Sequence, residues 1–289
     1  MDCPRCKSSG TIHFGKRHDG IQRFKCNDCG RQFCERTGTF FHRHRFPELV
    51  MRIAILINIF VCSEFTSLMM LLIFQVQVSS RSIRAWTAKF AETLPYAIPR
   101  SYSGDEPVRV HGDEKFVKVK ISKDTFAYWF ALVDHLVRPI AMFVSEARDG
   151  EAAETLFRHA KEAMDKAVDL LFTDGCPIYP KAAKVFGSYC KHAITGIKGR
   201  WITHLWQKKL YVYWATVNPV ESLNAQIEHF LQRFHGSFRN IDSANRWARI
   251  FLFRIYLQEL VAAQRASRTS SHDVNHHNLS VRELPVLAI

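Results

Sequence analysis

The chain has 289 residues, with 40 Lys plus Arg against 27 Asp plus Glu and a formal net charge of +13. This length allows about two domains and a substantial core. The basic excess points to a polyanionic partner, most often nucleic acid, although a merely basic soluble protein also fits the charge. No signal peptide is visible, and polar residues divide the one apolar stretch, 49–78, into blocks too short to span a bilayer. We therefore expect a cytoplasmic protein without a membrane partner.

Four of the eight cysteines form two tight pairs, CPRC and CNDC, made by Cys3, Cys6, Cys26 and Cys29. Such spacing in a reducing compartment is typical of metal binding, and two structural disulfides are the poorer alternative. Four thiolates can close a tetrahedral site around Zn²⁺, and a unit this small needs such a staple in order to fold. The sequence between the pairs predicts a β-hairpin that turns at residues 18–20. We predict a zinc ribbon with a structural Zn²⁺ over residues 1–45.

Residues 46–95 show the apolar periodicity of helices. The first helix begins near Pro47, and a second apolar block, 68–74, follows the polar break SEFTS. A third segment, 78–90, has Ser79 or Ser80 as its N-cap and three inward side chains, Ile83, Trp86 and Phe90. Its outward basic side chains are Arg81, Arg84 and Lys89. This pattern favours equally a helix-turn-helix whose last helix contacts DNA and a plain helical segment with a solvated basic face.

A Pro-, Ser- and Gly-containing connector, 96–107, marks a domain boundary, after which the periodicity changes to that of strands. Strands are predicted at 108–121, 125–136, 138–148, 168–175 and 189–194, and helices at 150–167 and 177–187. A further helix begins near residue 218. The order β-β-β-α-β-α-β-α predicts an α/β fold, a mixed sheet with helices on both faces.

Three carboxylates lie at the ends of, or within, separate predicted elements. Asp113 is in the first strand, Asp174 ends the apolar fourth strand, and Glu221 lies in the first turn of the helix after residue 217. An acidic residue at a helix start has an ordinary explanation in the helix dipole. Three carboxylates brought together, however, repel each other unless cations lie between them, and oxygen ligands suit two Mg²⁺ or Mn²⁺ ions. Such a pair of ions serves in-line phosphoryl transfer. Glu114 is expected to point to the opposite face of the sheet from Asp113.

The segments HGDEKFVKVK, LLFTDGCPIYPKA and NPVESLNAQIEHFLQRFHGSF resemble the three acidic motifs of Asp-Asp-Glu (DDE) transposases of small prokaryotic insertion sequences. The resemblance is nearest to family six of the insertion sequences, covers roughly residues 1–250 and extends to the zinc ribbon and helix-turn-helix. It implies a ribonuclease-H-like catalytic core over 108–264, in which the three carboxylates hold Mg²⁺ for 3′-end cleavage and strand transfer. It also implies recognition of terminal inverted repeats, double-stranded DNA as partner, a homodimer or higher homo-oligomer, and a nucleoid-associated location in the cytoplasm.

The chain departs from this family pattern in two places. The interval from Asp174 to Glu221, 221 − 174 = 47 positions, is longer than usual in that branch, and the extra material lies at about 196–214. A basic residue commonly follows the third carboxylate by two helical turns, but here Glu228 takes that place, which makes Glu228 a rival third ligand. Arg233 is expected to supply the missing positive charge toward DNA.

The insertion at 196–214 is basic, Trp-rich and hairpin-like. We predict phosphate contacts by Arg200, Lys208 and Lys209. Trp201 or Trp206 either stacks on an unpaired base or packs against the sheet. His192 is expected to support the site or the core, because Mg²⁺ prefers oxygen ligands.

The end of the chain is predicted to be a long apolar helix, 241–266, buried in the core or at a dimer interface, followed by a polar tail, 265–289. Two rival functions remain besides the transposase. One is a DNA-binding regulator that has lost the chemistry, which the presence of all three carboxylates opposes. The other is a structure-selective nuclease with the same metal site.

Overall fold

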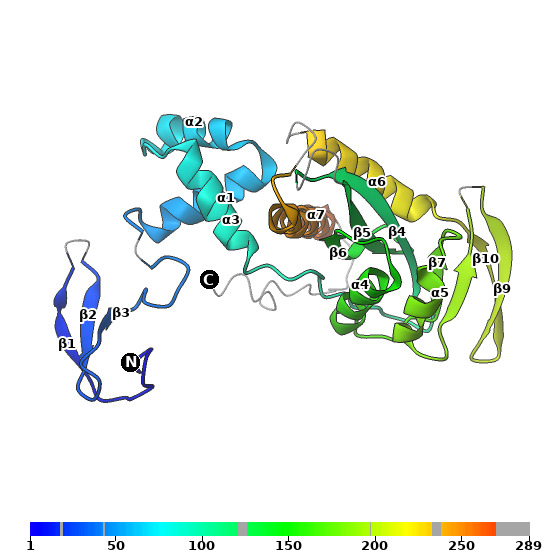
Figure 1. Ribbon diagram of the computed structural model, residues 1–289, viewed down its shortest axis with the longest axis horizontal. Helices are drawn as coiled ribbons and strands as arrows, with labels where there is room; N and C mark the ends of the chain where they lie inside the picture. The colour runs from blue at the N-terminus through cyan, green and yellow to red at the C-terminus, as the bar shows by residue number, and fades with distance from the viewer. Residues whose placement is uncertain (18–19, 43, 121–125, 197, 233–237, 270–289) are drawn as a thin grey trace. The chain divides into compact units, whose positions relative to one another are not determined.

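The computed structural model describes residues 1–17, 20–42, 44–120, 126–196, 198–232 and 238–269. The described residues form two compact units, 1–90 and 91–269 (Figure 1). Within these residues, no helix combines the length and apolar character that crossing a membrane requires.

The first unit begins with a small antiparallel sheet of order β1-β2-β3, formed by β1 (Thr11–Lys16), β2 (Gln22–Cys26) and β3 (Gln32–Cys34). The predicted hairpin is therefore present, although its turn at 18–19 lies outside the described residues. Phe24 and Phe33 stack with ring centroids 5.7 Å apart. The buried cluster around them is small and includes Cys3 and Cys26, so this sheet has little apolar core of its own.

Three helices follow in the same unit: α1 (Glu48–Phe60), α2 (Ser63–Phe74) and α3 (Ser80–Ala91). Ser79 is the N-cap of α3, because its Oγ accepts a hydrogen bond from the Ser82 N–H at 3.1 Å. The buried Asn58 amide donates to the Thr87 hydroxyl at 2.8 Å and ties α1 to α3. The prediction that residues 63–67 break the helix is wrong. Ser63 and Glu64 instead form the first turn of α2, where such residues are favoured.

The second unit is built on a five-stranded mixed sheet of order β6-β5-β4-β7-β8. Its strands are β4 (Arg109–Lys118), β5 (Phe126–Asp134), β6 (Pro139–Ser145), β7 (Leu170–Thr173) and β8 (Lys191–Ile194). β5 is antiparallel to both of its neighbours, β4 and β6, while β4, β7 and β8 run parallel. This is the strand order of a ribonuclease-H-like core, and the predicted α/β class and element order are confirmed.

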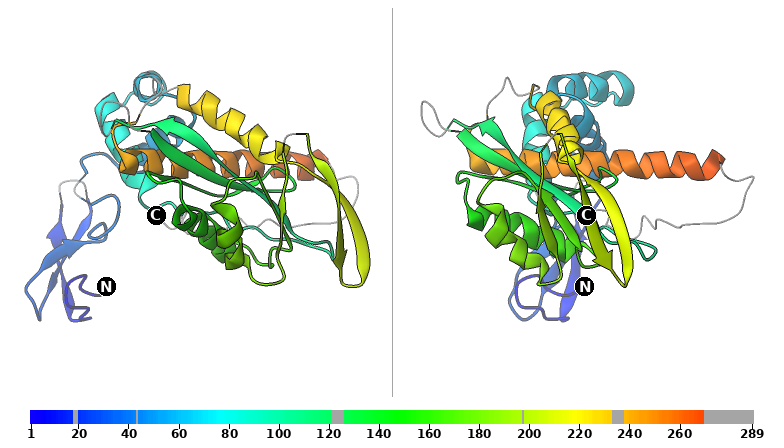
Figure 2. Two further views of the ribbon diagram at one scale, coloured as in Figure 1. Left: turned by 45° about the vertical axis from the view of Figure 1, so that its right-hand side comes forward. Right: turned by 90° about the vertical axis from the view of Figure 1, so that its right-hand side faces the viewer.

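Helices cover both faces of this sheet (Figures 1 and 2). On one face, Phe130 and Leu132 of β5 pack with α4 (Gly150–Ala163), α5 (Tyr179–Ala182) and the 3-10 helix η1 (Ala183–Phe186). On the other, Trp129 and Ala131 pack with α6 (Asn218–Leu231) and α7 (Ile241–Thr269). The predicted helix at 177–187 is reduced to α5 and η1, which fits the missing N–H groups of Pro177 and Pro180.

The insertion is a hairpin of β9 (Arg200–Trp206) and β10 (Lys209–Ala215), as predicted, and leads directly into α6. It packs against the sheet through Ile202 and Tyr213. Gly199 precedes the hairpin at φ +65, and a Cβ there would lie 2.6 Å from the Trp214 Nε1. The start of the hairpin therefore requires glycine.

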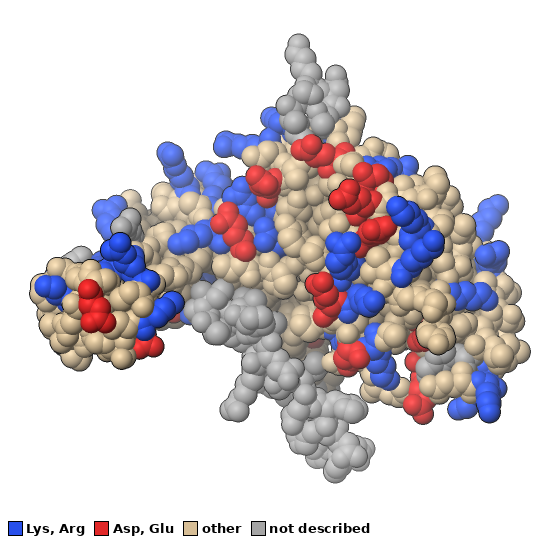
Figure 3. Space-filling model, turned by 60° about the horizontal axis from the view of Figure 1, so that its bottom comes forward, with Lys and Arg blue, Asp and Glu red and all other residues tan. Residues whose placement is uncertain are grey.

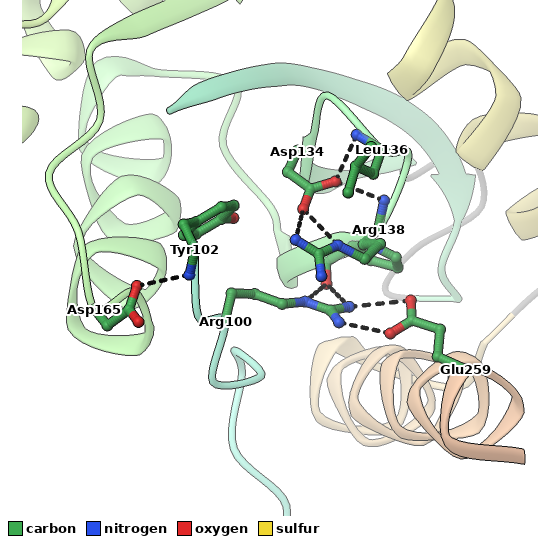
Figure 4. A network of polar contacts seen from close by, with 8 residues as sticks. Arg100, Tyr102, Asp134, Leu136, Arg138, Asp165 and Glu259 are labelled. Atoms are coloured by element: carbon green, nitrogen blue, oxygen red, sulfur yellow. Dashed lines mark hydrogen bonds and ion pairs between the residues drawn. The ribbon is translucent and has the colours of Figure 1, made fainter. Parts of the chain in front are cut away.

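An ion pair fixes the last helix to the segment before β4 (Figure 4). Arg100, only 5% exposed, forms hydrogen bonds of 2.5 and 3.1 Å with the two carboxylate oxygens of Glu259 on α7. The same guanidinium donates to the Pro139 carbonyl at the start of β6, with its Nε at 3.0 Å. Arg100 thus joins three segments that are far apart in the sequence.

Candidate active site

The two aspartates predicted for the site lie on neighbouring parallel strands. The register of β4 with β7 pairs Arg109 with Leu170 and His111 with Phe172, an offset of 172 − 111 = 61. Continuing this offset by two residues places Asp113 opposite Asp174, since 113 + 61 = 174. Paired residues on parallel strands point to the same face of a sheet. The fold therefore brings these two carboxylates to the same edge of the sheet, with Asp174 directly after the end of β7.

Glu221 approaches the same place from α6, which lies along the sheet beside β4 and β5. Pro219 is in the first turn, where its missing N–H costs nothing. Val220, Leu223 and Ile227 face the core and leave the Glu221 side chain exposed. Helix packing thus sets the position of Glu221, while its carboxylate remains open to a ligand.

The Asn224 side chain links α6 to Asp113. Its Nδ2 donates to the Asp113 Oδ2 at 2.8 Å. Asn224 is only 6% exposed, and its Oδ1 is buried without a hydrogen-bond partner among the described residues. A buried amide oxygen normally has a partner, so this one is available to a water molecule or a cation. Sequence reasoning used Asn224 only as support for Glu221 and missed its contact with Asp113.

The electrostatics of Asp113 show that the carboxylates are neighbours. Burial raises the pKa of the Asp113 carboxyl to about 7, opposed by a backbone hydrogen bond with Glu114. The charges of Glu114, Glu221 and Asp174 raise it further. A carboxyl whose pKa is raised by neighbouring carboxylates is in an arrangement that a bound cation relieves. The shift also favours Glu221 over Glu228 as the third ligand, because Glu221, and not Glu228, is among the causes of the raised Asp113 pKa.

Glu228 is engaged elsewhere. Its carboxylate accepts from the Lys115 Nζ at 3.1 Å, and its side chain is 65% exposed. Lys115 lies two residues after Asp113 on the same face of β4, and Glu228 lies two turns after Glu221 on α6. The pair is a second link between the same two elements. It also sets a lysine on β4 beside the position where the family pattern has a basic residue on the helix.

Glu114 points to the opposite face from Asp113, as predicted, and is buried there. Its carboxylate accepts from the Tyr179 hydroxyl of α5 and pairs with the Arg148 guanidinium. Burial, followed by the Glu114 charge, raises the pKa of the Tyr179 hydroxyl. This network anchors β4 to α5 directly behind the carboxylates. Its signal in the sequence was a carboxylate in register with the apolar face of the strand, which requires a buried partner.

The donor set of Asp113, Asp174 and Glu221 consists of oxygen atoms, which fit Mg²⁺ or Mn²⁺ and fit softer metals poorly. Their carboxylate oxygens are less tightly gathered than the cysteine sulfurs. The cysteine sulfurs form the one group of His, Cys, Asp or Glu ligand atoms in the described chain that all lie within 4.8 Å of one another. Carboxylates without a counter-charge repel, and both aspartates are half-buried while Glu221 is exposed. This arrangement suits a divalent cation bound from the solvent side.

The four predicted zinc ligands meet in the first unit. The Cys3 and Cys29 sulfurs are 3.5 Å apart, and those of Cys6 and Cys26 are 3.6 Å apart. Zn–S bonds of about 2.3 Å in a tetrahedron give sulfur separations of about 3.8 Å, whereas a disulfide needs about 2.05 Å. The spacing therefore fits a tetrahedral metal site and excludes the disulfide alternative for these pairs.

Two equivalent turns hold the cysteine pairs. The Lys7 N–H donates to the Cys3 carbonyl at 2.9 Å, and the Gly30 N–H donates to the Cys26 carbonyl at 3.0 Å. Lys7 and Gly30 each follow the second cysteine of a pair and have φ of 61 and 69. A backbone hydrogen bond from Cys6 is the main factor that lowers the pKa of the Cys3 thiol to about 6. Cys3 is thus the thiol that most readily gives thiolate, the form that binds metal. Against a backbone hydrogen bond with Ser8, by contrast, burial and the neighbouring cysteine sulfurs raise the pKa of the Cys6 thiol to about 12.

The basic residues predicted to contact DNA differ in their surroundings. Arg81, Arg200, Lys208 and Lys209 are exposed. Arg84 pairs with Glu64 of α2 at 3.0 Å, and the Lys89 Nζ donates to the Phe40 carbonyl at 2.7 Å. Arg233 lies outside the described residues. Figure 3 shows one face of the molecule, on which Lys and Arg are spread among Asp and Glu instead of forming one patch.

Two further predicted residues have clear positions. The His192 Nε2 lies 2.7 Å from the hydroxyl of Thr173, the residue before Asp174, so His192 supports the end of β7. Trp201 is 68% exposed, so packing against the sheet, one of its two predicted roles, is wrong for Trp201. The structure does not describe the Trp206 side chain.

Strand order and carboxylate placement together define the class of ribonuclease-H-like enzymes that act on nucleic acid through acidic residues. Residues 107–247, just under half of the chain, match the family model of the DDE domain of IS240-type transposases. The chain thus contains a domain similar to the DDE domain of these transposases, and the protein is an enzyme that acts on DNA. Use of a divalent metal follows from this type of domain.

Solved structures similar to the chain include retroviral integrases. The HTLV-2 integrase catalytic core domain in complex with magnesium is 16% identical, with a TM-score of 0.30 over 49% of this chain and 74% of that one. The simian T-cell lymphotropic virus intasome in complex with a PP2A regulatory subunit is 13% identical, with a TM-score of 0.32 over 63% and 60%. TM-scores this low do not establish a relationship by themselves. No curated protein matches the chain.

Proposed function

We propose that the protein is a DNA transposase that binds the terminal inverted repeats of an insertion sequence, cleaves the 3′ ends and joins them to a target. Asp113, Asp174 and Glu221 act as the catalytic carboxylates. The observation that carries this proposal is the meeting of three elements: β4 runs parallel to β7, and Asn224, three residues after Glu221 on α6, donates to Asp113 of β4. Two Mg²⁺ or Mn²⁺ ions bound there supply an activated attacking oxygen and a stabilised leaving oxygen.

The residues around the carboxylates position them. Asn224 holds one oxygen of Asp113 through its Nδ2 and leaves the other oxygen for a ligand. Glu114 anchors β4 from behind through Tyr179 and Arg148. Such partners fix the orientation of metal-binding side chains and raise metal affinity. The exposed Glu221 closes the site from the solvent side when cation and DNA arrive.

The first unit serves DNA recognition in this proposal. Cys3, Cys6, Cys26 and Cys29 hold a structural Zn²⁺, supported by their sulfur spacing. Helices α1 to α3 act as a helix-turn-helix with Arg81 toward DNA. For Arg84 to bind a phosphate, it must give up its ion pair with Glu64. Lys89 must likewise break its hydrogen bond to the Phe40 carbonyl. Arg200, Lys208 and Lys209 contact phosphates beside the catalytic core. The protein works as a homodimer or higher homo-oligomer, because two DNA ends must be held together.

One assay tests this function against its two rivals. Purified protein is incubated with Mg²⁺, a labelled transposon-end duplex and a supercoiled target plasmid. Joined product supports the transposase, cleavage without joining indicates a nuclease, and binding without reaction indicates a regulator. Asp174→Asn must abolish both steps while DNA binding persists. An active Asp174→Asn protein would contradict the site assignment.

A further inference from the structure

The outward face of the hairpin β9–β10 is apolar and exposed. The register pairs Trp201 with Trp214 and Leu205 with Leu210. These four side chains are 68%, 48%, 70% and 66% exposed, and Val212 on the same face is 56% exposed. The alternate residues Ile202 and Tyr213 pack toward the sheet. The hairpin therefore has one face that holds it in place and a second that no described part of the second unit covers, and such a face marks a binding surface.

The two tryptophans form an ordered platform at one end of this face. Their ring centroids are 5.2 Å apart at an interplanar angle of 69°. Gly199 lies against the Trp214 indole, so close that a Cβ would not fit. The Trp214 indole thus packs against the Gly199 backbone. The Trp201 ring contacts Trp214, and most of its surface remains exposed to solvent. Aromatic rings held in this way can stack on planar ligands at small entropic cost.

The charge around the platform selects the ligand. Between Asp174 and Glu221 the chain has 220 − 175 + 1 = 46 residues, which include seven Lys or Arg and no Asp or Glu. Three of the basic residues belong to the hairpin itself: Lys208 lies in its turn, while Arg200 and Lys209 alternate with the outward residues and so lie on the face of Ile202 and Tyr213. The combination of cations with exposed aromatic rings is that of sites for single-stranded nucleic acid, where phosphates meet the cations and bases stack on the rings. A purely apolar protein partner would not require this charge.

The base of the hairpin is fixed beside the carboxylates. The Thr216 carbonyl, one residue after β10, lies 2.9 Å from the His111 Nδ1, and His111 is two residues before Asp113. The Ala215 carbonyl accepts from the Thr195 hydroxyl at 2.8 Å. A seven-residue strand extends about 20 Å from that base. DNA that leaves the carboxylates therefore has the hairpin within reach.

We propose that the outward face of β9–β10 binds an unpaired DNA strand next to the reacting end, with Trp201 and Trp214 stacking on its bases and Lys208, in the hairpin turn, contacting its phosphates, while Arg200 and Lys209 add positive charge from the opposite face. This inference rests on the proposed transposase function. In this proposal the insertion recognises an unpaired strand, whereas the first unit recognises duplex DNA. The hairpin would distinguish an opened or overhanging DNA end from a blunt one.

The test compares two labelled DNA molecules, a blunt duplex and the same duplex with a single-stranded extension of about six nucleotides. Fluorescence anisotropy without Mg²⁺ gives Kd for the full-length wild type, Trp201→Ala, Trp201→Phe and the control Tyr189→Ala, which removes another exposed aromatic ring (94% exposed) outside the hairpin. We expect the wild type to bind the extended DNA about tenfold more tightly than the blunt duplex. Trp201→Ala loses that preference and keeps its affinity for the blunt duplex. Trp201→Phe retains most of the preference, and Tyr189→Ala retains all of it.

Several results would overturn the inference. Equal affinity of the wild type for both DNA molecules would reject it, and this result needs no variant and so does not depend on the folding of one. Equal preference in wild type and Trp201→Ala would also reject it. A third result would also reject it: Trp201→Ala changes the molar mass measured by light scattering but leaves the DNA affinity unchanged. The outward face of β9–β10 would then be a contact between two copies of the chain. Failure of the wild type to bind blunt duplex or to cleave it with Mg²⁺ instead counts against the proposed function itself.

Discussion

The protein contains two candidate metal sites that are built in opposite ways. In the first unit, four sulfurs converge within 4.8 Å, on loops with little apolar core beneath them. In the second, carboxylates from β4, the end of β7 and α6 are held by a sheet packed on both faces. The cysteine site, when it holds its metal, stabilises the surrounding small sheet, so metal binding and folding are coupled in that part of the chain. The second is held by its surroundings, so the scaffold should survive the loss of metal.

Cys26→Ser is expected to have the largest effect, because it removes a buried ligand from a unit that depends on its metal. Structural zinc binding is worth about 10–16 kcal/mol in small zinc units, so residues 1–45 should unfold while the second unit stays folded. Metal analysis should show the loss of one zinc per chain, and NMR should show the loss of the dispersed signals from this region. Cys62→Ser, at an exposed cysteine, is the matched control. Unchanged zinc stoichiometry in Cys26→Ser would contradict the four-cysteine site.

Asp174→Asn should leave the fold intact and remove chemistry. Loss of a direct ligand is expected to lower cleavage and joining by more than the 10- to 100-fold that is typical of losing an outer partner. Glu228→Gln serves as the control, because Glu228 pairs with Lys115 at the surface. Single-turnover rates of end cleavage at saturating protein measure both variants. If Glu228→Gln lost as much activity as Asp174→Asn, Glu228 would replace Glu221 as the third ligand.

Glu259→Ala tests the scaffold of the second site. It leaves the Arg100 guanidinium, 5% exposed, without its carboxylate. Removing one partner of a buried ion pair lowers the free energy of unfolding by about 3–5 kcal/mol. Because Glu259 is 27% exposed, water can partly replace its carboxylate beside Arg100, so we expect a loss at the lower end of this range. Denaturant unfolding should show a lower midpoint for the second unit and unchanged zinc content. Arg246→Ala, at a pair with Glu92 that is more exposed, should cost under about 1 kcal/mol.

Asn224→Ala is expected to be milder than loss of a carboxylate. The Asp113 carboxylate loses the hydrogen bond that orients it, which should weaken Mg²⁺ or Mn²⁺ affinity by about 10- to 100-fold. Titration of cleavage activity with Mn²⁺ separates this effect from a general loss, because the variant should recover at high metal concentration. Asn224→Ser, which keeps a shorter donor, should lie between the two proteins. A variant with unchanged metal dependence would show that Asn224 has only a packing role.

The pH dependence should be the smallest effect, and for the second unit it follows from Asp113 and His111. The folded pKa of Asp113, about 7, is above the ordinary value of about 3.9. The protonated form therefore favours the folded state at low pH, and this contribution is lost as pH rises through 7. His111 makes stability rise with pH, because burial lowers its pKa in the folded state to about 4. That rise ends near pH 6.5, the ordinary pKa of histidine. Without added Mg²⁺, thermal unfolding between pH 6.5 and 8 should show a falling Tm that Asp113→Asn abolishes and Mg²⁺ opposes.

Sequence patterns predicted most of the scaffold, because strand alternation and apolar runs report burial directly. They placed Asp113 in the first strand, Asp174 at the end of the fourth and Glu114 on the opposite face. They did not predict the partners, such as Asn224 with Asp113 or Lys115 with Glu228, because those contacts depend on the crossing of a helix over a strand more than 100 residues away. They also extended α5 too far and started α2 too late, where Pro and Ser change the local geometry.

The contact between Arg100 and Glu259 ties the segment before the first strand of the core to the last helix. All three carboxylates are already synthesised when the ribosome reaches residue 221, yet α7, which covers one face of the sheet, begins only at Ile241, and its ion pair with Arg100 requires Glu259. The first unit, with local contacts only, can fold much earlier, since domains form from the N-terminus during synthesis. A chain cut short before Glu259 would therefore retain the three candidate carboxylates and the four clustered cysteines but lack the ion pair that fixes α7 to the core. Such a fragment would bind DNA without acting on it.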